Sequence, residues 1–269
     1  MSVRLSAVLA CSLYLLFSAS VAPAQQPGTF LIIQPGQPGN TAEAQPVMDS
    51  LASYLSARIG RAQTGAYIND LDAAVRLLEQ NPPQWAVVSL GFYLQYAGRF
   101  HMVPLAATRP GGHDHDNWRV LVAPGYEGSE LAGDFQGSML YEQEAAACLL
   151  LRGRSGGIVG LRGDRRPLMA LRSTGRGEIT GAVLDVSQYE AARAMPFLAD
   201  FKVLFETGDL PNSPVVWLDS TTNPDPALVK ALLDMDSDPQ AAELLNSLRT
   251  KGFGPPDKRL NILRKECGL

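Results

Sequence analysis

Two stretches of the chain have a hydrogen-bonding side chain and a tyrosine at equivalent positions after a short apolar run. Residues 86–97 read Ala-Val-Val-Ser-Leu-Gly-Phe-Tyr-Leu-Gln-Tyr-Ala, and residues 182–192 read Ala-Val-Leu-Asp-Val-Ser-Gln-Tyr-Glu-Ala-Ala. A shift of 96 positions aligns two pairs of side chains, Ser89 with Asp185 and Tyr93 with Tyr189. Hydroxyls and carboxylates donate or accept hydrogen bonds, so both stretches are candidates for holding a polar ligand. For the tyrosines, the alternative is that each ring covers a part of the protein core.

A histidine-rich loop offers the side-chain types of a metal site. Residues 113–116 read His-Asp-His-Asp, and imidazoles and carboxylates suit zinc or copper. Alternate residues on one turn-rich loop supply only part of a ligand set, and the third histidine, His101, lies elsewhere in the chain. We therefore expect a solvated connection at residues 109–117 and no bound metal.

Signals of catalysis and of cofactor binding are weak. The sequence has no H-E-x-x-H and no C-x-x-C motif, and neither Gly-Lys-Ser/Thr nor G-x-G-x-x-G occurs in it. Glu142 with Glu144, or Asp185 with a partner, could supply carboxylates for acid–base work, but nothing in the sequence pairs them. We therefore expect a binding protein rather than an enzyme, with no catalytic residues and no cofactor.

Seven arginines and no lysine lie between Arg152 and Arg176. They form either a basic rim that attracts an anionic ligand or the surface of a partner protein, or a solvated face around a glycine-rich loop.

The candidate residues must be positioned by the elements that precede them. Apolar runs bounded by turn signals predict buried parallel strands at residues 29–33, 66–68 and 85–90. Helical spacing and capping residues predict helices between them, at residues 40–59 and 70–80. This alternation predicts a doubly wound sheet, in which ligands bind beyond the carboxyl ends of the strands. Gln34 and Ser89 lie at two of these ends.

The same alternation recurs in the second half of the chain. Strands are expected at residues 118–123, 137–140, 158–161 and 179–186, with helices at residues 141–151 and 166–174. Two further strands, at residues 202–206 and 214–218, precede two closing helices that begin behind Asp225 and Asp238.

The repeated alternation predicts two lobes that face one ligand. The candidate ligand-binding residues lie at or just beyond strand ends, and they are Gln34, Ser89, Tyr93, Tyr141, Glu142, Asp185 and Tyr189.

Residues 1–24 have the pattern of a secretory signal peptide. Arg4 precedes an apolar stretch from Leu5 to Ala22, and Ala22-Pro23-Ala24 is an A-x-A cleavage site. A retained membrane anchor and lipidation at Cys11 are the alternatives, but the stretch is short for a spanning helix of about 20 residues and continues past Cys11. We expect a periplasmic or extracytoplasmic protein without stable membrane insertion after cleavage.

The net charge argues against nucleic-acid binding, and the cysteines of an exported chain could form a disulfide. Lys and Arg number 23 against 27 Asp and Glu, a formal net charge of −4 at pH 7, which does not suggest a nucleic-acid binder. Cys148 and Cys267 remain after cleavage. In an exported chain they either pair, or they stay as one buried thiol and one thiol in the C-terminal tail.

The ordered set of elements resembles the type 2 periplasmic substrate-binding proteins of ABC transporters, and among them the phosphate/phosphite/phosphonate-binding family. Met48–Gly60 looks like the family's first helix, and Trp85–Ala97 looks like its strand that ends in a Gly-aromatic loop. Lys202–Phe253 contains Leu-Pro-Asn-Ser-Pro-Val-Val, a Pro-Ala-Leu helix, Asp-Ser-Asp-Pro and Lys-Gly-Phe, in the family's order. The resemblance covers nearly all of residues 25–269.

The resemblance implies an α/β fold of two lobes, each a doubly wound, mostly parallel sheet, joined by two hinge crossovers. Residues 25–108, completed by residues 208–269, would form the first lobe, and residues 109–207 the second. A small-molecule ligand would bind between the lobes of a monomer, and the closed form would deliver it to an ABC transporter permease.

One stretch departs from the family pattern. The family has a Ser/Thr/Gly-rich loop at the start of a second-lobe helix, which offers an oxyanion hydroxyls, N–H donors and the positive helix end. The matching residues 138–143 read Ser-Met-Leu-Tyr-Glu-Gln, and the Glu142 carboxylate repels a phosphonate. We therefore expect weak or absent phosphonate and phosphate binding, and a neutral, zwitterionic or cationic solute.

Other roles remain open beside transport. The chain could be a stand-alone periplasmic sensory or binding module, or a degenerate homologue without a transport role. A hydrolase or transferase would rest on analogy of fold alone.

Overall fold

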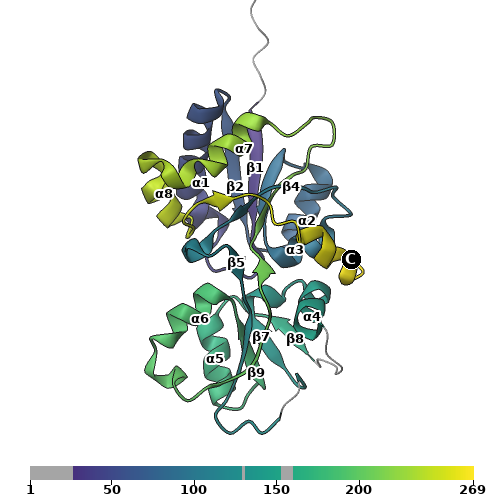
Figure 1. Ribbon diagram of the computed structural model, residues 1–269, viewed down its shortest axis with the longest axis vertical. Coiled ribbons are helices and arrows are strands. Elements are labelled where there is room, and N and C mark those ends of the chain that lie inside the picture. Colours follow the sequence, from purple (N-terminus) through teal and green to yellow (C-terminus); the bar gives the residue numbers. More distant parts are fainter. Residues whose placement is uncertain (1–26, 129–130, 153–159) are drawn as a thin grey trace, which may run out of the picture.

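The computed structural model describes residues 27–128, 131–152 and 160–269, and these form two α/β lobes stacked end to end (Figure 1). The predicted signal peptide lies outside the described residues. In the described part of the chain, no helix combines the length and the apolar character needed to cross a membrane.

The first lobe is built on a six-stranded sheet. Its strand order is β13-β4-β12-β3-β1-β2. The strands are β1 (Gly28–Ile33), β2 (Gln63–Ile68), β3 (Trp85–Val88), β4 (Val103–Thr108), β12 (Pro214–Trp217) and β13 (Phe253–Gly254). β1 pairs with β2 and β3 in parallel, whereas β12 runs antiparallel between β3 and β4. Segments from both ends of the chain therefore share one sheet.

Helices cover both faces of this sheet. They are α1 (Thr41–Ile59), α2 (Leu71–Gln80), α3 (Leu90–Tyr96), α7 (Pro226–Leu233), α8 (Ala242–Ser247) and α9 (Leu260–Glu266). The α1 helix begins where the Asn40 side chain accepts a hydrogen bond from the Glu43 backbone, and it ends at Gly60, whose φ is 73°. It buries Met48, Leu51 and Leu55 against the sheet.

The segment after β3 is a helix, although the sequence predicts a loop there. Ser89 caps α3 by accepting a hydrogen bond from the Phe92 backbone at 3.1 Å. Leu90, Phe92 and Leu94 are buried, so the helix is apolar on most of its surface. Its sequence therefore lacks the alternation of polar and apolar faces that predicts a helix. The Ser89 cap and the burial of its apolar side chains stabilise α3 instead.

The second lobe is built on a five-stranded sheet of order β10-β6-β9-β7-β8. Its strands are β6 (Arg119–Val122), β7 (Phe135–Gly137), β8 (Leu161–Gly163), β9 (Gly181–Leu184) and β10 (Lys202–Glu206). Its helices are α4 (Gln143–Leu151), α5 (Pro167–Gly175) and α6 (Val186–Arg193). In this lobe β7 is parallel to β8 and β9, and β6 is antiparallel to its neighbours. The predicted α/β fold with mostly parallel sheets is confirmed.

Several boundaries in this lobe differ from the predictions. A 3₁₀ turn at Ser138–Leu140 replaces most of the strand expected at residues 137–140, because β7 ends at Gly137. The strand expected at residues 158–161 lies two to three residues later, as β8, and residues 158 and 159 fall outside the described part. The helix α6 follows β9 directly, at residues for which no helix is predicted, and a capping box of Asp185 and Gln188 stabilises its start.

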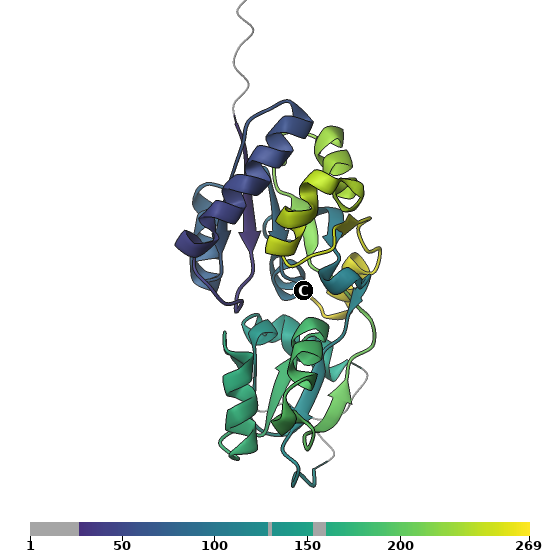
Figure 2. The ribbon, with the colours of Figure 1, turned by 90° about the vertical axis from the view of Figure 1, so that its left-hand side faces the viewer.

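Two chain segments cross between the lobes and pair with each other. The β5 strand (His115–Asp116) runs antiparallel to β11 (Leu210–Pro211). In Figure 2 these crossings lie toward one side of the junction, and the dark purple loop after β1 points toward the second lobe. One apolar cluster continues through the junction, for it contains Ile33 and Phe92 of the first lobe and Phe135 and Leu149 of the second.

Candidate functional site

The first interlobe contact joins two helix starts. The Ser89 Oγ, at the N-cap of α3, donates a hydrogen bond of 3.1 Å to Oε1 of Glu142, the N-cap residue of α4. Gly91 leaves room for this side chain, since a Cβ at that position would lie 3.0 Å from Glu142 Oε2. Two of the predicted site residues therefore meet directly across the junction.

The Glu142 carboxyl lies in an environment that resists negative charge. Only 1% of the residue is exposed. Burial raises the pKa of Glu142 from 4.5 to about 7, although the hydrogen bonds from its own backbone and from Ser89 oppose the shift. Its carboxyl is therefore partly protonated near neutral pH, and it can donate as well as accept a hydrogen bond.

A second contact places the loop after β1 against the second lobe. Gly36 has a φ of 81°, and a Cβ there would lie 2.0 Å from the Ser138 carbonyl oxygen and 2.6 Å from the Tyr141 ring. Only glycine fits this position, both for its backbone conformation and for the approach of the other lobe. Tyr141, another predicted site residue, thus lies at the junction.

Hydrogen bonds continue from Ser138 along the wall of the second lobe. The Ser138 Oγ accepts a bond of 2.6 Å from Gln188 Nε2, and the Gln188 backbone donates to Asp185 Oδ1 at 2.8 Å. Asp116, on the crossing strand β5, accepts from the Val186 backbone at 3.1 Å. Asp185 and Asp116 therefore both lie at the start of α6.

The pKa values of both carboxyls are raised. Burial first, and then the negative charge of Asp116, raises the pKa of Asp185 from 3.8 to about 7. Burial also raises the pKa of Asp116, against its hydrogen bonds from two backbone groups and from Trp118. The second lobe thus presents acidic groups that favour a proton, or a positive charge, nearby.

A third contact uses one residue of the arginine cluster. Arg165 Nη2 donates to the Asn69 carbonyl oxygen of the first lobe at 3.1 Å and lies 3.7 Å from Asp70 Oδ2. Other arginines of the cluster pair elsewhere: Arg166 with Asp164, and Arg176 with Glu178. Arg165 reaches the junction, but its charge already faces groups of the protein.

The remaining predicted residues lie apart from these contacts. Gln34 Nε2 donates to Ser213 Oγ at 3.4 Å, within the first lobe. Tyr93 is 1% exposed, and its hydroxyl donates to Asn261 of α9 at 3.0 Å. The ring of Tyr189 packs beneath the Arg119 guanidinium at 4.4 Å and beside the apolar cluster of α5 and α6. The structure thus joins Ser89 to Glu142 and places the neighbouring Tyr141 at the same junction, whereas Gln188 links Asp185 to Ser138.

Several residues of the junction are not among the predicted site residues. Gly36, Asn69, Arg165 and Gln188 make contacts or bonds described above. Gln188 could have been predicted from the sequence, because it lies three residues after Asp185, which is the spacing of a capping box. The others contact residues far along the chain, which no local pattern reveals.

No metal site is evident in the part of the chain that the structure describes. No group of three or more His, Cys, Asp or Glu residues with the spacing of a metal site occurs among those residues. His113 lies 3.4 Å from Glu190, and the His115 ring faces Arg259 at 2.9 Å. Two surface hollows, one beside Tyr54 and Arg58 and one beside Arg172 and Phe197, each belong to a single lobe.

Comparison with known proteins finds a similar family over part of the chain and similar folds over most of it. The family model described as "ABC transporter, phosphonate, periplasmic substrate-binding protein" matches residues 168–260. No curated protein sequence matches the chain.

Solved structures match over most of the chain. XAC2383 from Xanthomonas citri, bound to ATP, is 20% identical with a TM-score of 0.69, over 90% of this chain and 97% of that one. A binding protein component of an ABC phosphonate transporter (PA3383) from Pseudomonas aeruginosa is 12% identical with a TM-score of 0.62, over 90% and 88%. PhnD1 from Prochlorococcus marinus, in complex with methylphosphonate, is 13% identical with a TM-score of 0.62, over 90% and 97%.

These comparisons confirm the predicted resemblance to phosphonate-type periplasmic substrate-binding proteins of ABC transporters and the two-lobed fold. The matched family consists of periplasmic binding proteins rather than enzymes. They assign no ligand to this chain.

Proposed function

We propose that this protein binds a small solute between its lobes, in the periplasm, and delivers it to an ABC transporter permease. The site lies between a first lobe of residues 25–108 and 208–269 and a second lobe of residues 109–207. Residues 1–24 act as a signal peptide that is removed on export, and the mature protein works as a monomer. The family match and the two-lobed fold support this role.

The solute is neutral, zwitterionic or cationic. The observation that carries this proposal is the buried Glu142 carboxyl at the start of α4, where it bonds to Ser89. Asp185 and Asp116 add two further buried carboxyls on the same lobe. A solute with an ammonium or hydroxyl donor would satisfy these acceptors, whereas a dianion would be repelled.

The arginine that could neutralise a dianion at the junction already interacts with groups of the protein. Arg165, which reaches the junction, faces the Asn69 carbonyl and the Asp70 carboxylate. An incoming phosphonate would have to break these contacts and to approach Glu142 without a compensating donor. This chain therefore differs in expected ligand from PhnD1, whose structure holds methylphosphonate, and from XAC2383, whose structure holds ATP.

Calorimetric titration of the exported protein tests the proposal. Methylphosphonate, inorganic phosphate and ATP form one panel, and basic amino acids, zwitterionic amino acids and polyols form the other. We expect binding from the second panel only, and a ligand present at 100 times its dissociation constant should stabilise the fold by about 2.7 kcal/mol. Glu142→Gln keeps the shape of the side chain but cannot ionise, so this variant should bind a cationic ligand more weakly. Submicromolar binding of methylphosphonate by the unaltered protein would overturn the proposed ligand class.

A second candidate function is a sensory module that presents one closed form to another protein. The contacts of Ser89 with Glu142 and of Gly36 with Ser138 close the junction with the protein's own groups. Genes for a permease and an ATPase beside this gene would favour transport, and a gene for a sensor kinase would favour the sensory role.

A further inference from the structure

The C-terminal helix α9 is fixed to the first lobe. Leu260 and Leu263 are 1% and 3% exposed and belong to the main apolar cluster. Asn261 accepts the hydrogen bond from the buried Tyr93 hydroxyl of α3. Arg259, just before the helix, donates to the Asp209 carbonyl oxygen at 2.9 Å. Movement of α9 away from the first lobe would expose two buried leucines and break both hydrogen bonds.

The helix α4 is part of the second lobe and faces the first. It contacts β8 and the 3₁₀ turn at Ser138–Leu140 on one side and α3 on the other. Ala145, Ala146, Leu149 and Leu150 are buried in the apolar cluster. Its start makes the Ser89–Glu142 bond described above, so any separation of the lobes along this edge must move α4 away from α3 and α9.

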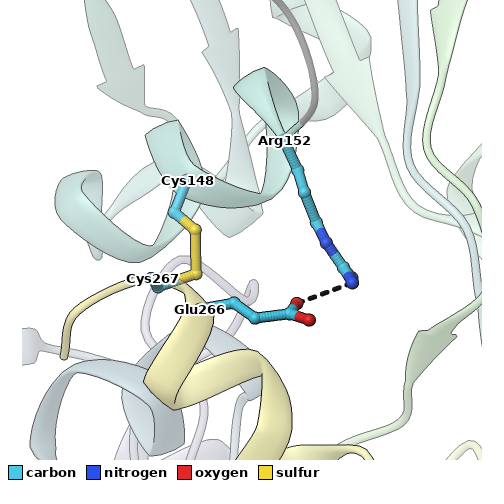
Figure 3. Close-up of a disulfide and its surroundings, with 4 residues drawn as sticks. All are labelled: Cys148, Arg152, Glu266 and Cys267. Carbon is cyan, nitrogen blue, oxygen red and sulfur yellow. Dashed lines mark ion pairs between the residues drawn. A yellow bond between two sulfur atoms is a disulfide. The ribbon is translucent and has the colours of Figure 1, made fainter.

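A disulfide joins these two helices across the junction (Figure 3). Cys148 of α4 bonds to Cys267, which follows α9, with a Cα–Cα distance of 5.6 Å. Beside it, Arg152 forms an ion pair of 2.6 Å with Glu266. Disulfides rarely span more than about 6.8 Å between Cα atoms. The lobes therefore cannot separate at this edge while the disulfide is intact, and they can move only about it and the crossings at β5 and β11.

We propose that the Cys148–Cys267 disulfide is a redox-sensitive latch that holds the second lobe against the first, and that its reduction permits the lobes to open. The crossing strands alone leave two covalent connections between the lobes, and the disulfide adds a third on α4. Cys148 and Cys267 are partly exposed, so a small dithiol can reach them. The ion pair of Arg152 with Glu266, at 50% and 42% side-chain exposure, is too solvated to hold this edge alone.

The reductant is a dithiol, and the exchange balances. One thiolate of the dithiol attacks a sulfur of the disulfide, which forms a mixed disulfide and releases the other cysteine as a thiolate that takes up a proton. The second thiol of the reductant then loses its proton and displaces the remaining cysteine. Two electrons and two protons pass to the protein, and the dithiol becomes a cyclic disulfide. The oxidising periplasm would keep the latch closed in the absence of such a reductant.

Small-angle X-ray scattering and amide hydrogen exchange of the exported protein test the latch without any solute. We expect dithiothreitol to enlarge the radius of gyration and to speed exchange of the amides at residues 90–93 and 143–146 by about tenfold or more. The variant Cys148→Ser with Cys267→Ser should behave like the reduced protein and should not respond to dithiothreitol. Arg152→Ala, which removes only the ion pair, should stay in the compact form.

Two results would overturn the latch. The first is unchanged scattering and exchange when alkylation and mass spectrometry show that both thiols are free. The second is global unfolding on reduction, seen as loss of the far-ultraviolet dichroism, because the disulfide would then support the fold rather than restrain the lobes. Both outcomes are measured without a solute, and titration of both the oxidised and the reduced protein then distinguishes a closed latch from a wrong solute class.

Discussion

Ser89 and Glu142 are the N-cap residues of two helices whose starts meet across the junction of the lobes, and a hydrogen bond of 3.1 Å joins their side chains. The partial positive charge of a helix N-terminus favours an ionised carboxylate, whereas burial opposes it. Burial has the larger effect here, since the pKa of Glu142 rises to about 7. The lobes are therefore held together by a carboxyl whose charge changes close to neutral pH.

The pH dependence of stability should report on Glu142. Its pKa is about 7 in the folded protein and near 4.5 when unfolded, so between these values the folded state keeps a proton that the unfolded state has released. Stability therefore falls as the pH rises from about 4.5, and the loss is complete above about 7. Glu142→Gln cannot ionise, so its stability relative to the unaltered protein should rise between pH 5 and pH 8, by on the order of 3 kcal/mol.

Urea unfolding at pH 5, 6, 7 and 8 measures this difference. Asp185 titrates in the same range but is present in both proteins, so its effect cancels. Glu144→Gln is the matched control, because Glu144 is an exposed residue in the first turn of the same helix. Parallel stability curves for the unaltered protein and Glu142→Gln would contradict the assigned environment.

Removal of the Ser89 hydroxyl should cost more than loss of a helix cap. Ser89→Ala leaves the Phe92 backbone N–H without its acceptor and deprives the buried Glu142 carboxyl of a donor. A cap alone contributes about 1 kcal/mol, and a buried group left without its partner costs a further 1–3 kcal/mol, roughly. Because this donor lowers the pKa of Glu142, its loss should also move the pH-dependent fall in stability to higher pH.

Asn40→Ala is the control for capping alone. The Asn40 side chain caps α1 by accepting from the Glu43 backbone, at an exposed position within one lobe. Denaturant unfolding of both variants separates the two effects, and Ser89→Thr should restore much of the loss. Equal costs for Ser89→Ala and Asn40→Ala would mean that the bond to Glu142 contributes nothing to stability.

Alanine substitutions at Gly36 and Gly39 separate the cost of backbone strain from the cost of a clash with the other lobe. Both have positive φ, 81° and 93°, so alanine at either position should cost about 1–2 kcal/mol in backbone strain. Only at Gly36 would the new Cβ meet the other lobe, 2.0 Å from the Ser138 carbonyl oxygen, whereas at Gly39 the nearest atom is 3.6 Å away. Gly36→Ala should therefore destabilise the protein more than Gly39→Ala and enlarge its radius of gyration. Similar scattering from the two variants would place the loop away from the second lobe.

Local features of the fold could be predicted from the sequence because their causes are local. Capping residues predict helix starts at residues 40 and 70, and the structure shows the Asn40 and Asp70 side chains accepting capping hydrogen bonds there. The helices α3 and α9 were missed, because each has only seven residues and a short helix shows little periodicity. The burial of Leu260 and Leu263 by tertiary contacts is what stabilises α9.

The contacts between the lobes could be predicted only in part. Strand ends pointed to Ser89 and Glu142, although their bond joins residues 53 positions apart. The same reasoning also selected Tyr93, whose ring instead fills the core, because a helix after β3 turns it inward. Gly36 and Arg165 were missed, because their roles depend on contacts with the other lobe. Gly36 must be small where the second lobe approaches it, and Arg165 bonds to the backbone of the first lobe.

Arg165 should contribute modestly to closure and nothing to anion binding. Arg165→Ala removes the hydrogen bond to the Asn69 carbonyl oxygen and a charge 3.7 Å from Asp70. The Arg165 side chain is 40% exposed, so solvent screens the pair and we expect a loss below about 1 kcal/mol that shrinks further in high salt. Arg166→Ala is the matched control: Arg166 is 71% exposed and pairs with Asp164 in its own segment, so its loss should be smaller still.

A double-mutant cycle resolves the interlobe part of this effect. Asp70→Asn keeps a side-chain acceptor for the cap of α2 while removing the charge that faces Arg165. The coupling between Arg165→Ala and Asp70→Asn, measured by urea unfolding in low salt, should be about 0.5 kcal/mol or less. In calorimetry, neither the unaltered protein nor Arg165→Ala should bind methylphosphonate. If the unaltered protein binds it and Arg165→Ala does not, the guanidinium is an anion receptor rather than a link between the lobes.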